Sequence, residues 1–176
     1  MTDKQEILQS ILLSGPLQEV NFYQINDSFF ELQEDGFWII DTGIELKFPE
    51  GIVSASWNSE LESYVIDNDS VKNIFNQKLL FQLETENIKN MQKFVGLNVV
   101  NANFKSLEFE YVVDYTMRTE KEKRFVELTL DFENNSKIQI AFIDYILEEN
   151  QAPRDFSFDL STNLLISTKQ VFEIKT

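Results

Sequence analysis

Carboxylates and lysines are the side chains that could do acid–base chemistry in this sequence, because histidine and cysteine are both absent. Histidine is the usual general base near neutral pH and the commonest metal ligand. Its absence excludes Ser-His-Asp hydrolysis, Cys-His proteolysis and histidine-ligated zinc chemistry. Catalysis would have to use carboxylates, lysine, or a Mg²⁺ or Ca²⁺ ion held by carboxylates.

One aspartate stands in a sequence context that is typical of catalysis. The stretch WIIDTGI, residues 38–44, places Asp41-Thr42-Gly43 directly after an apolar run. This tripeptide resembles the active-site signature of aspartic proteases, in which two carboxylates share one proton and activate water. The resemblance implies a homodimer, because the chain carries the tripeptide once. The alternative, which we favour, is a strand-turn-strand with Gly43 at a positive φ.

The best candidate for a metal loop fails at its defining positions. Asp67-Asn68-Asp69-Ser70 begins like a calcium loop, but its sixth position is Lys72 instead of glycine and its twelfth is Lys78 instead of glutamate. A glycine-rich phosphate loop is also absent. We therefore expect no metal, no other cofactor and no enzymatic activity.

The elements around these residues are mainly strands. Alternating apolar residues rich in Phe, Val, Ile and Tyr predict antiparallel sheet. Helical spacing predicts two short helices at about 3–13 and 85–95, with Gly96 ending the second, and 70–76 could add a short helical turn. The predicted strands cover 20–26, 28–33, 37–41, 43–48, 52–58, 79–83, 98–117, 123–133, 137–147, 163–167 and 170–175. The expected fold class is α+β, dominated by β-structure.

The 176 residues predict one domain, because no linker or low-complexity segment divides the chain. The halves, about 1–83 and 84–168, could be an internal duplication sharing one core. Ile44, Leu46 and Phe48 lie 84 residues before Leu128, Leu130 and Phe132, in similar apolar patterns. Any two hairpins with alternating apolar residues would align in the same way, so both explanations stay open.

The net charge of −15 argues against binding to nucleic acid or to anionic membranes, and it permits a basic protein partner. Acidity that only keeps a Phe-rich chain soluble is the simpler explanation. The net negative charge concentrates in the first half: residues 1–84 hold 15 acids and 4 bases, whereas residues 85–176 hold 15 acids and 11 bases.

The stretch 109–132 predicts a hairpin with acids on its outer face. Placing the apolar residues of both strands on one face, with a loop at 118–123, sets Glu110 opposite Asp131 and Asp114 opposite Glu127. Each such pair would destabilise the sheet by about 0.2–1 kcal/mol. The candidate partner-binding acids combine this hairpin with the acidic segment 31–69: Glu31, Glu34, Asp35, Glu45, Glu60, Glu62, Asp67, Asp69, Glu110, Asp114, Glu127 and Asp131.

These observations lead us to expect a non-enzymatic acidic protein that presents this surface to a basic protein, such as an immunity-type protein that neutralises a toxin. The first alternative is a β-barrel or sandwich that binds a small molecule or lipid in a Phe-lined cavity. A hydrolase that uses carboxylates alone is the third candidate. The N-terminus lacks a signal sequence or membrane span, so a cytoplasmic location is expected. The sequence leaves the oligomeric state and the identity of the partner open.

Overall fold

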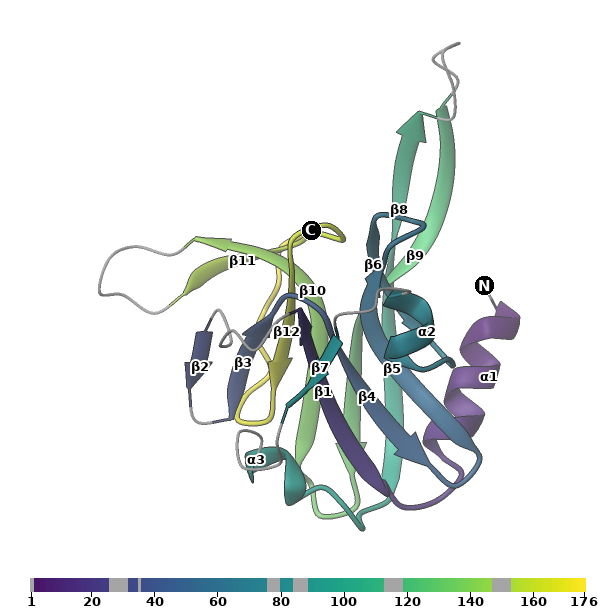
Figure 1. The fold of residues 1–176 in the computed structure, drawn as a ribbon, viewed down its shortest axis with the longest axis vertical. Coiled ribbons are helices and arrows are strands. Elements are labelled where there is room, and N and C mark those ends of the chain that lie inside the picture. The colour runs from purple at the N-terminus through teal and green to yellow at the C-terminus, as the bar shows by residue number, and fades with distance from the viewer. Residues whose placement is uncertain are drawn as a thin grey trace.

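The computed structural model describes residues 2–25, 32–34, 36–75, 80–83, 89–112, 119–146 and 153–176. These residues form three helices and twelve strands, arranged as in Figure 1. The helices are α1 (Thr2–Leu12), α2 (Val71–Phe75) and α3 (Lys89–Gln92). The strands are β1 (Glu19–Ile25), β2 (Leu32–Glu34), β3 (Phe37–Ile40), β4 (Gly43–Phe48), β5 (Gly51–Asn58), β6 (Ser63–Asp67), β7 (Leu80–Gln82), β8 (Val99–Val112), β9 (Thr119–Phe132), β10 (Lys137–Ile146), β11 (Arg154–Phe158) and β12 (Asn163–Ser167).

The strands form two antiparallel sheets. The first sheet has the order β6-β5-β4-β1-β7. The second has the order β2-β3-β12-β10-β9-β8, and β11 pairs with the far end of β10. The chain passes from the second sheet back to the first between β3 and β4, so the strands of the two sheets are not separated into two blocks along the sequence. This β-dominated architecture with short helices confirms the expected α+β class.

A large core lies between the two sheets. Its members alternate along the strands, for example Ile44 and Leu46 in the first sheet and Leu128 and Leu130 in the second. The period-two pattern follows from the pleat, which points successive side chains to opposite faces. α1 packs against β5 and β8, one strand from each sheet. Its Leu8 and Leu12 are fully buried in the same core.

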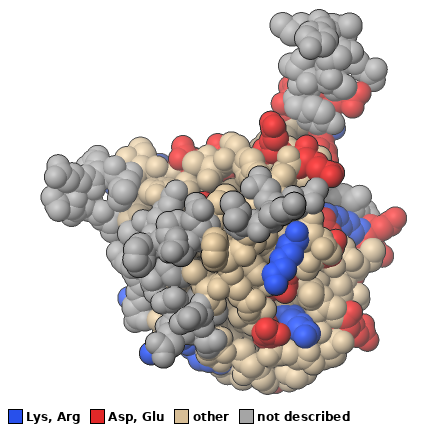
Figure 2. All heavy atoms as spheres, viewed as in Figure 1, with Lys and Arg blue, Asp and Glu red and all other residues tan. Residues whose placement is uncertain are grey.

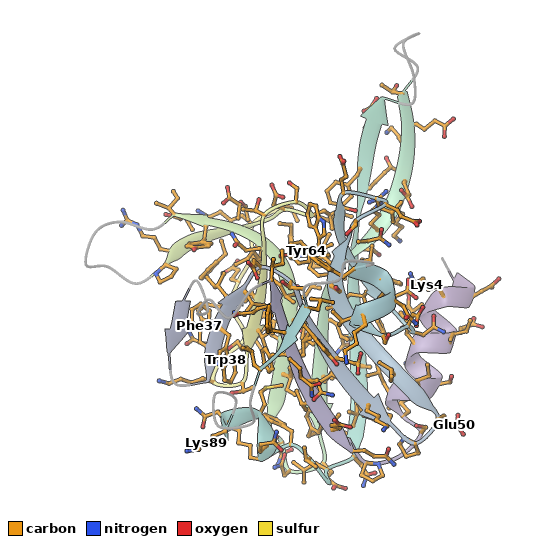
Figure 3. All side chains as sticks on the ribbon, viewed as in Figure 1. Lys4, Phe37, Trp38, Glu50, Tyr64 and Lys89 are labelled. Carbon is orange, nitrogen blue, oxygen red and sulfur yellow. The ribbon has the colours of Figure 1, made fainter. Side chains whose placement is uncertain are left out.

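The central strands of the second sheet are buried on both faces, which explains their unbroken apolar runs. In β3, Trp38 points into the core between the sheets, whereas its neighbour Phe37 joins a second, smaller cluster on the opposite face (Figure 3). β11 and the C-terminal segment cover that opposite face through Phe156 and Ile174. Both faces of β3 are therefore apolar and the strand shows no alternation.

Most predicted elements are present, with a few differences. The helix expected at 3–13 is α1, although its Ile7 is 48% exposed. The segment 70–76 does form a helix, α2, so the structure has three short helices. Of the helix expected at 85–95, residues 89–95 are described, and α3 already ends at Gln92. Gly96 has the expected positive φ of 90°, but turn residues separate it from the helix, so it does not directly end α3. Residues 84–88 lie outside the described residues.

Two strands were missed by the sequence analysis, and one was wrongly expected. β6 and β11 are only five residues long each and carry polar residues, so their alternation is weak. The segment 170–175 forms no strand. It crosses the outer face of the second sheet and pairs only through a bridge between Lys175 and Ser157.

The predicted register of the 109–132 hairpin is wrong. Glu110 lies opposite Lys121, and Glu127 lies opposite Lys105. Asp131 lies opposite Asn101, whose side-chain amide donates to it at 2.9 Å. The structure therefore sets acids against cations and amides rather than against acids.

The position of the turn causes most of this difference. β8 ends at Val112, so the partner of Glu110 moves from the expected Asp131 to Lys121. β9 already begins at Thr119, within the segment 118–123 that we expected to be the loop. Beyond the last pair with β10, Phe125 and Val126 are still buried in the core, and the ends of β8 and β9 then leave the body as a two-stranded arm, residues 108–112 and 119–123 (Figure 1).

The two halves share a local geometry. In the meander β1-β4-β5, Leu46 lies opposite Val53; in the meander β8-β9-β10, Leu130 lies opposite Ile138. These pairs correspond in the proposed repeat. The segments before the two meanders also meet, since Leu17 exchanges backbone hydrogen bonds with residues 96 and 97. The insertion of β2 and β3 into the opposite sheet departs from a simple repeat, and duplication stays a prediction.

No helix within the described ranges combines the length and the apolar character that crossing a membrane would require.

Candidate functional site

The Asp41-Thr42-Gly43 tripeptide forms the crossing from β3 to β4. Gly43 does not have the positive φ that we expected. It lies in β4 so close to β5 that an added Cβ would stand 2.9 Å from the carbonyl oxygen of Ala55. Thr42 is fully buried and its hydroxyl donates to the exposed Asp41 carboxylate at 3.0 Å. The glycine is thus explained by the close approach of two strands.

Glu45 is buried and does not belong to an exposed surface, contrary to our expectation for this residue. It is 7% exposed and lies on the face of β4 that α2 covers. Its Oε2 accepts the backbone N–H of Val71 at 3.1 Å, at the start of α2. It also accepts a hydrogen bond from the Tyr23 hydroxyl. Burial, followed by the charges of Glu45 and Glu19, raises the pKa of Tyr23 to about 12.

The other predicted acids fall into three groups. Glu31, Asp35 and Asp114 lie outside the described residues, as does the side chain of Glu34 on β2. Glu60, Glu62, Asp67 and Asp69 lie in and around the turns that flank β6. Glu110, Glu127 and Asp131 are spread along β8 and β9. The structure therefore brings only the second group together.

A hollow of about 240 Å³, which we call the acidic hollow, gathers three of these acids. Its lining consists of Asn58, Glu60, Asp67, Asp69, Asn73 and Ile74. All three of its charged residues are acids.

Short local hydrogen bonds shape the acidic hollow. The Asn58 side chain accepts the backbone N–H groups of Glu60 and Leu61, both at 2.9 Å. Asp69 accepts from the Asn73 amide at 2.8 Å. These contacts hold the turns on both sides of β6 in place, so the carboxylates are positioned by the fold.

The acids of the hairpin are compensated by neighbours. Lys137 contacts Asp131 at 2.6 Å and, together with Asn101, lowers the pKa of that carboxyl. Glu127 accepts from the Gln139 amide at 2.7 Å. Acidic side chains do gather where the arm leaves the body (Figure 2). Lys121 contacts Glu108 at 2.9 Å. The hairpin of β8 and β9 is therefore a weaker candidate than the acidic hollow.

A second hollow, of about 460 Å³, lies between β6, β9 and the start of α1, and it was not predicted from the sequence. We call it the basic hollow because four cations line it: Lys4, Lys121, Lys123 and Arg124. Three of them are close together in the sequence KEKR, residues 121–124. That run was the available signal, but we had assigned most of it to a loop.

The structure offers no further chemical centre in the parts described. No group of three or more acids there could hold a metal ion. The phenylalanines pack against other rings inside the cores, as in the pairs Phe94–Phe132 at 4.9 Å and Phe156–Phe172 at 5.0 Å. No family model matches this chain, and no curated protein or solved structure shows significant similarity to it.

Proposed function

We propose that this chain is a non-enzymatic binding protein that presents the acidic hollow to a basic protein partner. The observation that carries the proposal is the lining of this hollow, in which Glu60, Asp67 and Asp69 converge from the two turns beside β6. At about 240 Å³ the hollow is smaller than most small-molecule pockets. A single long side chain, lysine or arginine, suits it better than a free ligand does.

The surroundings of the hollow support a protein partner. Leu61 is 52% exposed beside Glu60, so a partner that binds these acids could also bury apolar surface there. The net charge of −15 would steer a basic protein toward this surface and make the association fast and salt-sensitive. A protein of the immunity type, neutralising a basic toxin, would belong to this class.

The alternative of a Phe-lined cavity has less support. The phenylalanines described above contact each other, and Phe125 is the one phenylalanine that lines either of the two hollows. A hydrolase would need two convergent carboxylates around a water molecule. Asp67 of the acidic hollow is already held by Lys4 at 2.7 Å. We therefore propose binding rather than catalysis.

The test is affinity capture at low salt with three forms of the chain. The hollow variant carries Glu60→Lys and Asp69→Lys. The control variant carries Glu50→Lys and Glu173→Lys, which change the net charge equally at exposed positions outside the hollow. We expect a basic protein to bind the wild type and the control variant and not the hollow variant, and its binding to weaken as salt is raised.

Because the two variants have the same net charge, long-range steering is equal in both and only local contacts differ. Capture of the same basic protein by all three forms would place the contact elsewhere. Failure of the wild type to retain any basic protein at low salt would refute the proposed function.

A further inference from the structure

The lining of the basic hollow is rich in cations, although the whole molecule has a net charge of −15. The chain has 15 cations and 30 acids, and yet four of its cations line this one hollow together with a single acid, Glu122. Asp67 and Glu108 also contact Lys4 and Lys121 from outside the lining. Glu110 lies opposite Lys121 as well, so four carboxylates neighbour the four cations, in a molecule where acids are twice as frequent as bases.

Arg124 forms a fixed wall of the basic hollow. Its side chain is 21% exposed, and its Nη1 donates to the Ser63 hydroxyl of β6 at 2.7 Å. Its Nε and Nη2 both contact Glu122 Oε2 at 2.7 Å. These bonds tie β9 to the edge strand of the first sheet. The hollow is thus held open by the fold between two sheet edges.

The lysines around this wall keep donors for a ligand. A lysine ammonium has three N–H donors. Lys4 uses one toward Asp67, and Lys121 uses one toward Glu108. Lys123 is exposed at the rim. An anion that enters the hollow can therefore accept hydrogen bonds from several ammonium groups without breaking the ion pairs.

Apolar residues form the rest of the lining. Tyr64 and Phe125 are buried at 1% and 6% exposure, whereas Leu61 is half exposed. Val65 and Ile66 of β6 complete this side. Figure 3 shows Tyr64 inside the molecule and Lys4 on α1. The volume of about 460 Å³ is within the range of small-molecule pockets.

We propose that the basic hollow binds a small amphipathic anion, a phosphate monoester or carboxylate with a short apolar body. The anionic group contacts the lysines, and the apolar body lies against Leu61, Val65 and Phe125. A purely inorganic anion would leave this apolar lining unused. The inference does not depend on the proposed basic partner, because it concerns the opposite charge and a different hollow. The two proposed sites share Leu61 and meet at the ion pair between Lys4 and Asp67.

The test is calorimetric titration at low salt with octyl phosphate and octanoate, both below their micellar concentrations, and with inorganic phosphate. We expect saturable binding of one equivalent of octyl phosphate or octanoate and much weaker binding of inorganic phosphate. The two amphiphiles distinguish a phosphate from a carboxylate preference. Backbone amide shifts of the wild type should change at β6 and at residues 121–125.

Matched variants locate the site. Lys123→Glu removes one attraction and adds one repulsion at the rim, so affinity should fall about tenfold or more. Leu61→Ser should lower the affinity for octyl phosphate and octanoate and leave the affinity for inorganic phosphate unchanged. Lys47→Glu makes the same charge change on β4, outside both hollows, and should leave affinity unchanged. All three residues are exposed, so the variants should fold, and circular dichroism checks this.

Three results would overturn the proposal. They are the absence of saturable amphiphile binding to the wild type, equal affinity for inorganic phosphate, and equal weakening by Lys123→Glu and Lys47→Glu. The amide shifts give an independent answer if a variant is unstable, because shifts confined to other strands would also place the anion elsewhere.

Discussion

Replacing the buried carboxylate Glu45 by alanine should destabilise the protein strongly. The Glu45 carboxylate accepts hydrogen bonds from the backbone N–H of Val71 and from the Tyr23 hydroxyl, and both lie in the interior under α2. Each donor left without an acceptor costs about 1–3 kcal/mol. The free energy of unfolding should fall by about 2–5 kcal/mol in Glu45→Ala, a large part of the total for a typical domain.

Glu45→Gln separates the effect of the charge from that of the hydrogen bonds. The glutamine oxygen can still accept the Val71 N–H, and the Tyr23 hydroxyl can turn to accept from the amide. The loss should then be about 1 kcal/mol. The measurement is urea unfolding followed by tryptophan fluorescence, with the exposed Glu50→Ala as control, which should stay within about 0.5 kcal/mol of the wild type.

The reasoning would be refuted if Glu45→Ala matched the Glu50→Ala control. A gain in stability in Glu45→Gln would refute it differently, by showing that the cost of desolvating the carboxylate exceeds the value of its contacts. The phenol provides a second readout, because the charge of Glu45 contributes to the raised pKa of Tyr23. Phenolate absorbance should show a lower pKa for Tyr23 in Glu45→Gln.

The raised pKa of Tyr23 also predicts how stability changes at high pH. The folded protein holds the neutral phenol up to a pKa of about 12, whereas the ordinary value is 10.0. The unfolded chain ionises first, so this contribution is complete below pH 10 and is lost as the pH rises toward about 12. Tyr23→Phe should remove this part of the pH dependence of unfolding.

Three further predictions concern the sheets. Glu110→Lys should place two cations opposite each other at Lys121 and destabilise the arm by about 0.2–1 kcal/mol, and adding Lys121→Glu should restore the loss in thermal unfolding. Gly43→Ala should cost about 1–3 kcal/mol in urea unfolding, because its Cβ would press on the backbone of β5 at 2.9 Å. The pKa of Asp131 is lowered by Lys137, so its contribution to stability is present above the ordinary pKa of 3.8 and is lost as the pH falls below it. In Asp131→Asn, the free energy of unfolding should depend less on pH below about 3.8 than it does in the wild type.

Local patterns made most of the fold predictable. Apolar residues alternate along β4, β5, β9 and β10 because successive side chains point to opposite faces of the sheet. One face lies in the core, so the alternation can be read from the sequence. The glycine at position 96 correctly indicated a positive φ, which is a local requirement, but α3 ends earlier, at Gln92. β6 and β11 escaped prediction because polar residues interrupt their five positions, SYVID and RDFSF, whereas the equally short β12 has the apolar run Leu164-Leu165-Ile166.

The register of the hairpin could not be predicted in the same way. We placed the loop at 118–123 and paired the apolar residues around it. The strands instead end at Val112 and begin at Thr119, and the register shifts by one residue beside Ser106, which only pairing in three dimensions reveals. The observed register sets Glu110 opposite Lys121 and Glu127 opposite Lys105, which removes the apparent conflict of like charges.

The candidate sites show the same division. The acids beside β6 could be listed from the sequence, since they are close along the chain. The burial of Glu45 depends on how α2 packs on β4. The ion pair between Asp67 and Lys4, which are 63 residues apart, depends on how α1 packs.

The sequence by itself determined the β-dominated α+β class, the helix at the N-terminus and the excess of acids, because these follow from periodicity and composition. The tertiary structure alone decided where charge gathers. It set β6 and its acidic turns beside the KEKR segment of β9, so that an acidic and a basic hollow are neighbours on a molecule of net charge −15. Composition records how many charges a chain has, but electrostatic recognition depends on distances between residues, and those are fixed only when the two sheets pack together.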